Sequence, residues 1–379
     1  MTKTTRKELL SVIKERYLKA KRKEKTEILD EFCKSTGHNR EYAIRILRAG
    51  YGYAASMSRK RHRRYGSAFL ALVIKLWELL EYPCGTRLKP QLAPLAEALI
   101  RAKEITVSED EARQLRAVSA KTLDRRLKRE REMRHLARNR GMTRHGSLVK
   151  SAIPIRITDW DAKEIGFMEM DTVAHNGGDP SGTFVYSLDM VEIATGWSEQ
   201  AAVLGKSEEA VVNAIKEIRA GLPFALKGLD SDSGGEFVNW HMVRYCEGEK
   251  LFFTRSRPNK KNDNAYVEQK NYTHIRKWMG YRRYDAEAQR DSMNDLYRNE
   301  LRLFNNFFRP VMKILKKEKL NNSICKKTYG AALTPYQRLM QAKSIPPETK
   351  AELRKLYESL NPAQLKKEIG AKLKRIQKS

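Results

Sequence analysis

The chain changes its pattern of apolar residues at about residue 164, and this change constrains the fold more than any other feature. Three strand-like segments follow one another there: IGFMEMDTV (165–173), TFVYSLDMVEI (183–193) and WSEQAAV (197–203). Helices and strands then alternate: an amphipathic helix capped by Ser207 (207–222), a strand (225–232), a helix (236–248), a strand (251–256) and a helix from residue 264. This order predicts an α/β core, with a mixed sheet flanked by helices, over residues 163–312.

Acidic residues stand at the ends of three of these elements. Asp171 ends the apolar stretch GFMEMD of the first strand-like segment, Asp232 ends the strand at 225–232, and Glu268 lies in the first turn of the helix from residue 264. Polar residues at strand ends line the functional edge of an α/β sheet, and carboxylates are ligands that Mg²⁺ and Mn²⁺ prefer. Convergence of the three would create a site for two ions that act on a phosphodiester. Each one alone is equally typical of a surface carboxylate.

Three further acidic residues lie in or beside these strands. Asp230 competes with Asp232, because residues two apart on a strand share a face. Asp189 and Glu192 are expected at a hairpin, with a structural or surface role.

The net charge of +29 is unevenly distributed along the chain. Residues 1–150 carry a net charge of +20, residues 151–250 carry −9, and residues 251–379 carry +18. Two basic arms around an acidic centre indicate a protein that grips a polyanion on both sides of a carboxylate-rich site.

The N-terminal arm contains two candidate helix-turn-helix regions. The first, at 1–65, has three short helices with Ser35-Thr36-Gly37 as a turn and Asn39 as a cap, followed by SRKRHRRYG. The second, at 66–140, has SEDEARQLRAV and then AKTLDRRLKREREMRHLAR, capped by Ser119. A basic linker is expected at 141–162 and a basic, mostly helical region at 313–379. The predicted DNA contacts in this arm are Arg40, Arg45, Arg48, Arg59, Lys60, Arg61, Arg63, Arg64, Lys121, Arg125 and Lys128.

Composition excludes several other classes of protein. The four cysteines lie far apart without a Cys-x-x-Cys pair, which argues against a disulfide framework or a structural zinc site and fits a reducing cytoplasm. No segment approaches the roughly 20 apolar residues of a membrane span, and the N-terminus lacks a secretory signal. A serine protease with Ser233 as nucleophile is excluded, because this order of helices and strands cannot supply its two barrels. We therefore expect a soluble, cytoplasmic protein that joins the nucleoid when it binds DNA.

The acidic motifs resemble those of the DDE transposase and retroviral integrase superfamily. The matching segments are MEMDT, LDSDSGGEF and RSRPNKKNDNAYVEQKN, with 35 residues between Asp232 and Glu268. The last segment, followed by RKWMGYRRYD, is similar to bacterial insertion-sequence transposases with an integrase core. The resemblance covers roughly residues 150–290 and departs from the superfamily at Ser233, where Asn is frequent.

This resemblance implies a ribonuclease H-like core and a transposase that binds the terminal repeats of a mobile element in double-stranded DNA. Mg²⁺ or Mn²⁺, held by Asp171, Asp232 and Glu268, would support nicking of the element ends and transfer of the freed 3′-hydroxyl into target DNA. A homodimer or a larger homo-oligomer is implied, because two ends must be brought together. Basic residues expected near the phosphates are Arg255, Arg257, Lys260, Lys261, Lys270 and Lys277, with His274 on the same helix face.

Two alternative functions remain open. A catalytically idle DNA-binding regulator would share the basic arms, and a simple metal-dependent nuclease of the same fold would cut DNA without joining it. The presence of all three acidic residues argues against the first alternative, and two candidate helix-turn-helix regions favour end recognition over general degradation.

Overall fold

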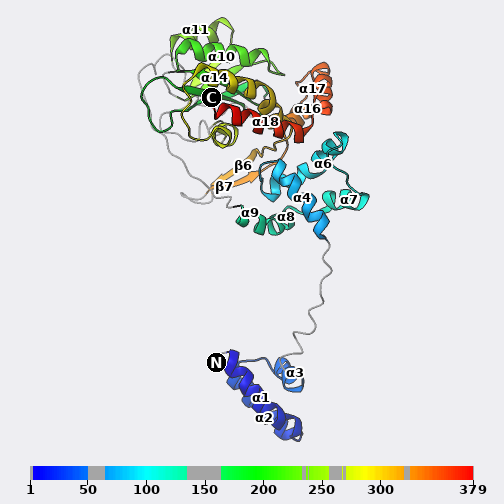
Figure 1. Cartoon of the computed structure of the whole chain (residues 1–379). Helices are drawn as coiled ribbons and strands as arrows, with labels where there is room; N and C mark the ends of the chain where they lie inside the picture. Colours follow the sequence, from blue (N-terminus) through cyan, green and yellow to red (C-terminus); the bar gives the residue numbers. More distant parts are fainter. Residues whose placement is uncertain are drawn as a thin grey trace. The chain divides into compact units, whose positions relative to one another are not determined.

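The computed structural model describes residues 3–49, 65–134, 164–232, 236–237, 239–255, 267, 270–319 and 325–378. The chain divides into two compact units, Met1–Gly66 and Ser67–Ser379 (Figure 1). Within the described ranges, no helix combines the length and apolar character that a membrane span requires.

The first unit contains the three predicted helices, α1 (Lys3–Lys19), α2 (Arg22–Thr36) and α3 (Arg40–Ala49). Gly37 follows α2 with a φ of 69°, a left-handed conformation that glycine adopts without strain. The side chain of Asn39 accepts a hydrogen bond from the backbone N–H of Glu41 at 2.9 Å and so caps α3. Phe32 and Leu47 are fully buried in the small core of this unit. The three helices are therefore present, whereas their recognition of DNA remains a prediction.

The second unit begins with a group of short helices. They are α4 (Ser67–Leu79), α5 (Gly85–Leu88), η2 (Lys89–Gln91), α6 (Leu92–Arg101), α7 (Glu109–Ala117), α8 (Ala120–Arg126) and α9 (Lys128–Met133). The Ser119 side chain caps α8 as predicted, accepting from the Thr122 N–H. The single helix predicted from residue 120 is instead interrupted at Leu127. This interruption buries Leu127 and places the guanidinium groups of Arg131 and Arg134 within 6 Å of the Trp77 ring centre, at 5.6 and 5.9 Å.

A five-stranded mixed sheet follows, in the order β3-β2-β1-β4-β5. Its strands are β1 (Phe167–Ala174), β2 (Val185–Glu192), β3 (Ser198–Leu204), β4 (Gly228–Ser231) and β5 (Phe252–Arg255). The first three strands are antiparallel neighbours, whereas β4 and β5 run parallel to β1. All five strands coincide with predicted strand segments, and the mixed sheet predicted from their order is confirmed.

The two faces of the sheet differ in chemistry. Met168, Met170 and Leu229 belong to the apolar face, which packs against α10 (Glu208–Ala220) and α11 (Trp240–Gly248). The alternate positions along the same strands are polar, because successive side chains point to opposite faces. This polar face is covered by η3 (Asn271–Arg276), α14 (Glu287–Leu296) and η4 (Tyr297–Leu301), through bonds such as Tyr297 to Ser187 at 2.7 Å. The sheet is thus buried on both sides, with a polar layer on one of them.

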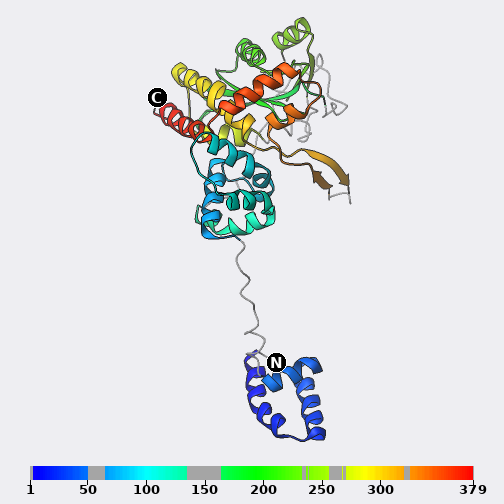
Figure 2. The ribbon, with the colours of Figure 1, turned by 90° about the vertical axis from the view of Figure 1, so that its right-hand side faces the viewer.

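The C-terminal region, expected to be mostly helical from residue 313, contains three helices in its described residues and also a hairpin that was not expected. It starts with a two-stranded antiparallel hairpin, β6 (Ile314–Lys319) and β7 (Cys325–Tyr329). The hairpin is not part of the five-stranded sheet and is drawn in orange in Figure 2. The hairpin escaped prediction because ILKKEK and CKKTY carry almost no apolar alternation. The remaining helices are α13 (Lys277–Met279), α15 (Arg302–Phe307), α16 (Pro335–Gln341), α17 (Pro347–Ser359) and α18 (Pro362–Ile376).

Candidate active site

Two of the predicted carboxylates meet where β1 and β4 run side by side. Because these strands are parallel, with Met170 opposite Ser231, the next positions along each strand are Asp171 and Asp232. Asp171 lies within β1, and Asp232 is the first residue after β4. Both side chains are partly buried. The sheet therefore brings together two residues that are 61 positions apart in the sequence.

The carboxylates of Asp171 and Asp232 repel each other, and this repulsion affects the pKa of Asp171. Burial, and after it the neighbouring carboxylate of Asp232, raise the pKa of Asp171 to about 7. Two hydrogen bonds act in the opposite direction: the Asn271 amide donates to Asp171 Oδ2 at 2.6 Å, and the Thr172 N–H donates to Oδ1 at 2.8 Å. A bound cation would relieve the repulsion and keep both groups ionised.

The structure separates Asp230 from Asp232. Asp230 is fully buried and lies opposite Glu169. This pair comes two residues before Asp171 and Asp232 along the two strands. Its carboxylate accepts a hydrogen bond from the Thr254 hydroxyl at 2.5 Å. Asp232 is the group whose charge acts on Asp171. Geometry therefore favours Asp232 over Asp230 as the partner of Asp171.

Glu268 lies outside the described residues, but positions on either side of it are fixed to β1. The backbone N–H of Val267 donates to Glu169 Oε2 at 3.1 Å, and Asn271 bonds to Asp171. Glu169 and Asp171 are two residues apart and share the polar face of the sheet. Val267 and Asn271 are thus both bonded to the strand that carries Asp171.

Asp189 belongs to this site, which corrects its expected place at a hairpin. It lies within β2, directly opposite Asp171, and is fully buried. Gln200 Nε2 donates to Asp189 Oδ1 at 2.8 Å, while burial raises the Asp189 pKa to about 7. The sequence contains one indication of this role, a single acidic side chain among the apolar residues of LDMV. Glu192, by contrast, is structural: its carboxylate accepts from the Thr195 N–H at 2.6 Å in the following turn.

Asn271 is a further residue of the site that the sequence analysis did not single out. It stands three residues after Glu268 in the sequence. Its hydrogen bond to Asp171 orients that carboxylate. The surrounding segment Asn271–Arg276 is a π-helix, a rare form that frequently occurs at functional sites.

The basic residues predicted near the site lie in different environments. Lys270 is partly buried, with its ammonium 3.3 Å from His274 Nε2, and burial lowers its pKa well below the usual range. Lys277 forms an ion pair with Glu81 at 2.7 Å. Arg255 is only 5% exposed at the end of β5. Their role in DNA binding stays a prediction.

The other basic residues predicted to contact DNA are in part described by the structure and in part outside it. Arg45 and Arg48 on α3 are exposed, as are Lys121, Arg125 and Lys128, whereas Arg40 is paired with Asp30. The other predicted contacts lie outside the described residues: Arg59, Lys60, Arg61, Arg63, Arg64, Arg257, Lys260 and Lys261.

Two carboxylates at the sheet edge fit a hard divalent cation. Asp171 and Asp232 supply carboxylate oxygens at adjacent positions, and their mutual repulsion favours a bound cation. Among the described residues there is no cluster of three or more His, Cys, Asp or Glu that could hold a metal. The predicted third ligand, Glu268, is outside that set.

Comparison with known proteins gave one extensive similarity. No family model matches the chain. The uncharacterized protein y4rM of Sinorhizobium fredii is 36% identical over 337 residues, which cover 88% of this chain and 95% of that protein. Among solved structures, the catalytic core domain of BIV integrase matches 45% of this chain and 91% of its own length, with 15% identity and a TM-score of 0.30. The HTLV-2 integrase catalytic core domain in complex with magnesium matches 38% of this chain and 88% of its own, with 12% identity and a TM-score of 0.29.

The raised pKa of Asp189 leads to a first prediction. Its folded value of about 7 exceeds the ordinary 3.8, so ionised Asp189 destabilises the fold. That penalty is absent below about pH 4 and complete above about pH 7. Asp189→Asn keeps the acceptor for Gln200, and in a metal chelator it should raise the free energy of unfolding by on the order of 2–4 kcal/mol at about pH 8. Near pH 4 the two proteins should be alike. Urea unfolding at both pH values tests this, and equal stability at pH 8 would contradict it.

Proposed function

The chain belongs to the same family as the uncharacterized protein y4rM of Sinorhizobium fredii, and we propose that this member is a DNA transposase of the DDE type. The observation that carries the proposal is the placement of Asp171 and Asp232 side by side on parallel strands, with the flanks of Glu268 tied to β1. The order and spacing of the three acidic motifs, which resemble those of the superfamily, support it further.

The roles of the residues follow from this placement. Asp171, Asp232 and Glu268 would hold two Mg²⁺ or Mn²⁺ ions. When bound, such ions supply the charge that activates an attacking hydroxyl and stabilises the leaving oxygen of a phosphodiester. Asn271 orients Asp171 through its hydrogen bond of 2.6 Å. Asp189 and Gln200 form a fixed, buried polar layer behind the site.

The reaction then consists of two displacements at phosphorus. Water attacks the phosphodiester at each end of the element and frees a 3′-hydroxyl, which next attacks a phosphodiester of the target DNA. The substrate is double-stranded DNA in both steps. A homodimer or larger homo-oligomer is proposed because the two ends must be held together.

The test uses the full chain and linear DNA that carries the sequences flanking its gene on both sides, with further DNA beyond them. With Mg²⁺ or Mn²⁺, we expect nicks with 3′-hydroxyl ends and joining of those ends to a supercoiled plasmid, both resolved on a gel. With Ca²⁺ we expect binding without cleavage. Cleavage in a chelator would refute the metal-dependent mechanism. Cutting without joining would identify a nuclease, and binding without either reaction would identify a regulator.

The first unit supplies a second prediction about DNA. Residues 1–66 contain 19 Lys and Arg and 7 Asp and Glu, a net charge of +12, and form a compact unit of their own. Removing them should abolish preference for the element ends over random duplex while the second unit stays folded. The affinity of the intact protein should fall more steeply with salt than that of the truncated one, because each phosphate contact adds about −0.9 to the log–log slope. Filter binding over a salt series measures both. Equal end preference in the truncated protein would place recognition elsewhere.

A further inference from the structure

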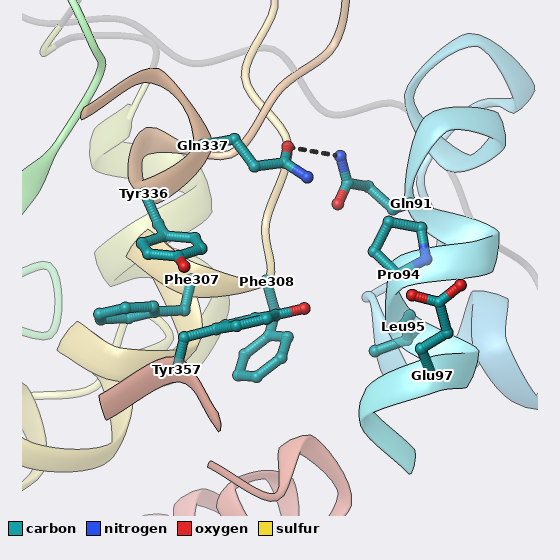
Figure 3. A pocket seen from close by; sticks show the side chains of 9 residues that line it. All are labelled: Gln91, Pro94, Leu95, Glu97, Phe307, Phe308, Tyr336, Gln337 and Tyr357. Atoms are coloured by element: carbon teal, nitrogen blue, oxygen red, sulfur yellow. Dashed lines mark hydrogen bonds between the residues drawn. The ribbon is translucent and has the colours of Figure 1, made fainter. Parts of the chain in front are cut away.

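A narrow cavity lies in the second unit, apart from the carboxylates of the candidate active site. Its volume is about 230 Å³. One wall is formed by Pro94 and Leu95 of α6, and the other by aromatic rings from α15 to α17 (Figure 3). Pockets for drug-sized ligands span about 300–1,000 Å³. This cavity is smaller, so it accommodates about one flat ring system.

The aromatic wall is an ordered stack. Tyr336 and Tyr357 are stacked with ring centres 4.8 Å apart and planes 20° from parallel. Phe307 lies 5.0 Å from Tyr336, and Phe308 lies 5.8 Å from Tyr357. Phe307 and Phe308 are each 3% exposed, so the wall is held rigidly by the core. Because Tyr336 stacks on Tyr357 and Arg101 lies over the Tyr357 ring, a flat ring in the cavity would meet the edges of the aromatic rings on one side and the Pro94 and Leu95 side chains on the other.

One edge of the cavity carries a pair of amides. Gln91 Nε2 donates to Gln337 Oε1 at 3.2 Å and to the carbonyl of Ala332 at 3.3 Å. Gln337 Oε1 also accepts from the Thr334 N–H at 2.9 Å. The remaining amide atoms, Gln337 Nε2 and Gln91 Oε1, point toward the space between the walls in Figure 3. The edge thus offers one donor and one acceptor side by side, a pattern that complements the polar edge of a nucleobase.

The rim of the cavity carries an ion pair between Glu97 and Arg116 and the guanidinium group of Arg101. Glu97 stands at the opening, with its carboxylate 3.6 Å from the guanidinium of Arg116. Arg101 lies over the Tyr357 ring at 5.5 Å, and it donates to the carbonyl of Glu358 at 3.0 Å. The opening therefore does not present an uncompensated negative charge to a polyanion.

From the aromatic wall, the amide edge and the size of the cavity, we infer that it binds one unpaired nucleobase of single-stranded DNA. Aromatic and apolar side chains on both sides of an extruded base hold it, and the amides fix its edge. The inference rests on the proposed function only in taking DNA as the polymer. Strand breakage at an element end is the process that would supply such a base.

The test measures binding of a short single strand that contains the fluorescent base analogue aminopurine, without any divalent metal. Stacking quenches its fluorescence. Tyr357→Leu keeps an apolar side chain but removes a ring, and it should weaken single-strand binding roughly tenfold, with less quenching. Tyr357→Phe is the matched control and should behave like the parent chain.

A second variant addresses the amide edge without disturbing the helix cap. Gln337→Glu retains the acceptor for Thr334 and Gln91 but removes the donor that faces the cavity. We expect several-fold weaker binding of the single strand, while both variants bind blunt duplex as the parent does. Thermal unfolding verifies that each is folded.

Two results would overturn the inference. One is single-strand affinity and quenching that are the same in Tyr357→Leu, Gln337→Glu and the parent chain. The other is a change of oligomeric state in Tyr357→Leu with unaltered single-strand binding, which would assign the cavity to a side chain of a second copy. Because no cleavage is measured, Asp232→Asn protein should quench normally. The inference can thus hold even where the transposase proposal fails.

Discussion

Asp232→Asn should reduce both nicking and joining of DNA by about a thousandfold or more, while DNA binding in Ca²⁺ remains. Asparagine preserves the size of the side chain but removes the charge that a divalent cation requires, and metal stabilisation of a phosphoryl transition state amounts to several kcal/mol. Asp232 lies beside Asp171 at the end of parallel strands, where no other described carboxylate can substitute from the same position. Rates of end nicking in Mg²⁺, compared with the parent chain, measure the effect.

Asp230→Asn is the matched control for this prediction. Asp230 is fully buried two residues before Asp232, and an asparagine there keeps the acceptor for the Thr254 hydroxyl. Nicking should therefore fall by no more than a few-fold. An equal loss in both variants would leave the metal ligand undecided, and a greater loss in Asp230→Asn would show that Asp230 is the ligand.

The sheet could be predicted from the sequence because its signals are local. The segment 165–173 corresponds to β1 (Phe167–Ala174), and the Ser207 cap predicted for α10 accepts from the Ala210 N–H at 3.3 Å. Apolar alternation and capping residues depend on neighbours a few positions away, which the sequence displays directly. The position of Asp171 and Asp232 followed once the strands were placed.

The polar face of the sheet could not be predicted in the same way. Asp189 contacts Gln200 through strand pairing, and Tyr297 reaches Ser187 from a helix 110 residues away. Such buried polar groups are stable only because distant partners satisfy them, and one sequence does not show which partners meet. The break at Leu127 likewise accompanies tertiary contacts, namely the burial of Leu127 and the approach of Arg131 to the Trp77 ring, and such contacts override the helical preference of the surrounding residues.

Glu268→Gln should have the second large effect on catalysis, because it removes the charge of a proposed metal ligand. Glu268 is also the proposed ligand that lies outside the described residues. The neighbouring contacts, from Val267 to Glu169 and from Asn271 to Asp171, do not involve the Glu268 carboxylate. The fold should therefore survive the change. Without metal, removing one of three proposed neighbouring carboxylates should also relieve repulsion and leave stability unchanged or slightly higher. Urea unfolding in a chelator measures this.

The catalytic consequence should be opposite in sign. Nicking and joining should both fall by orders of magnitude, because the ions lose a charged ligand, while duplex binding without divalent metal should be unchanged or slightly tighter after loss of a negative charge near phosphate. Glu236→Gln is the matched control. Glu236 is also an acidic residue near β1, and its Oε1 accepts a hydrogen bond from the Thr172 hydroxyl at 2.9 Å, an acceptor that glutamine keeps. If Glu268→Gln joins DNA ends at the rate of Glu236→Gln, the third ligand is another residue and the proposed active site is wrong.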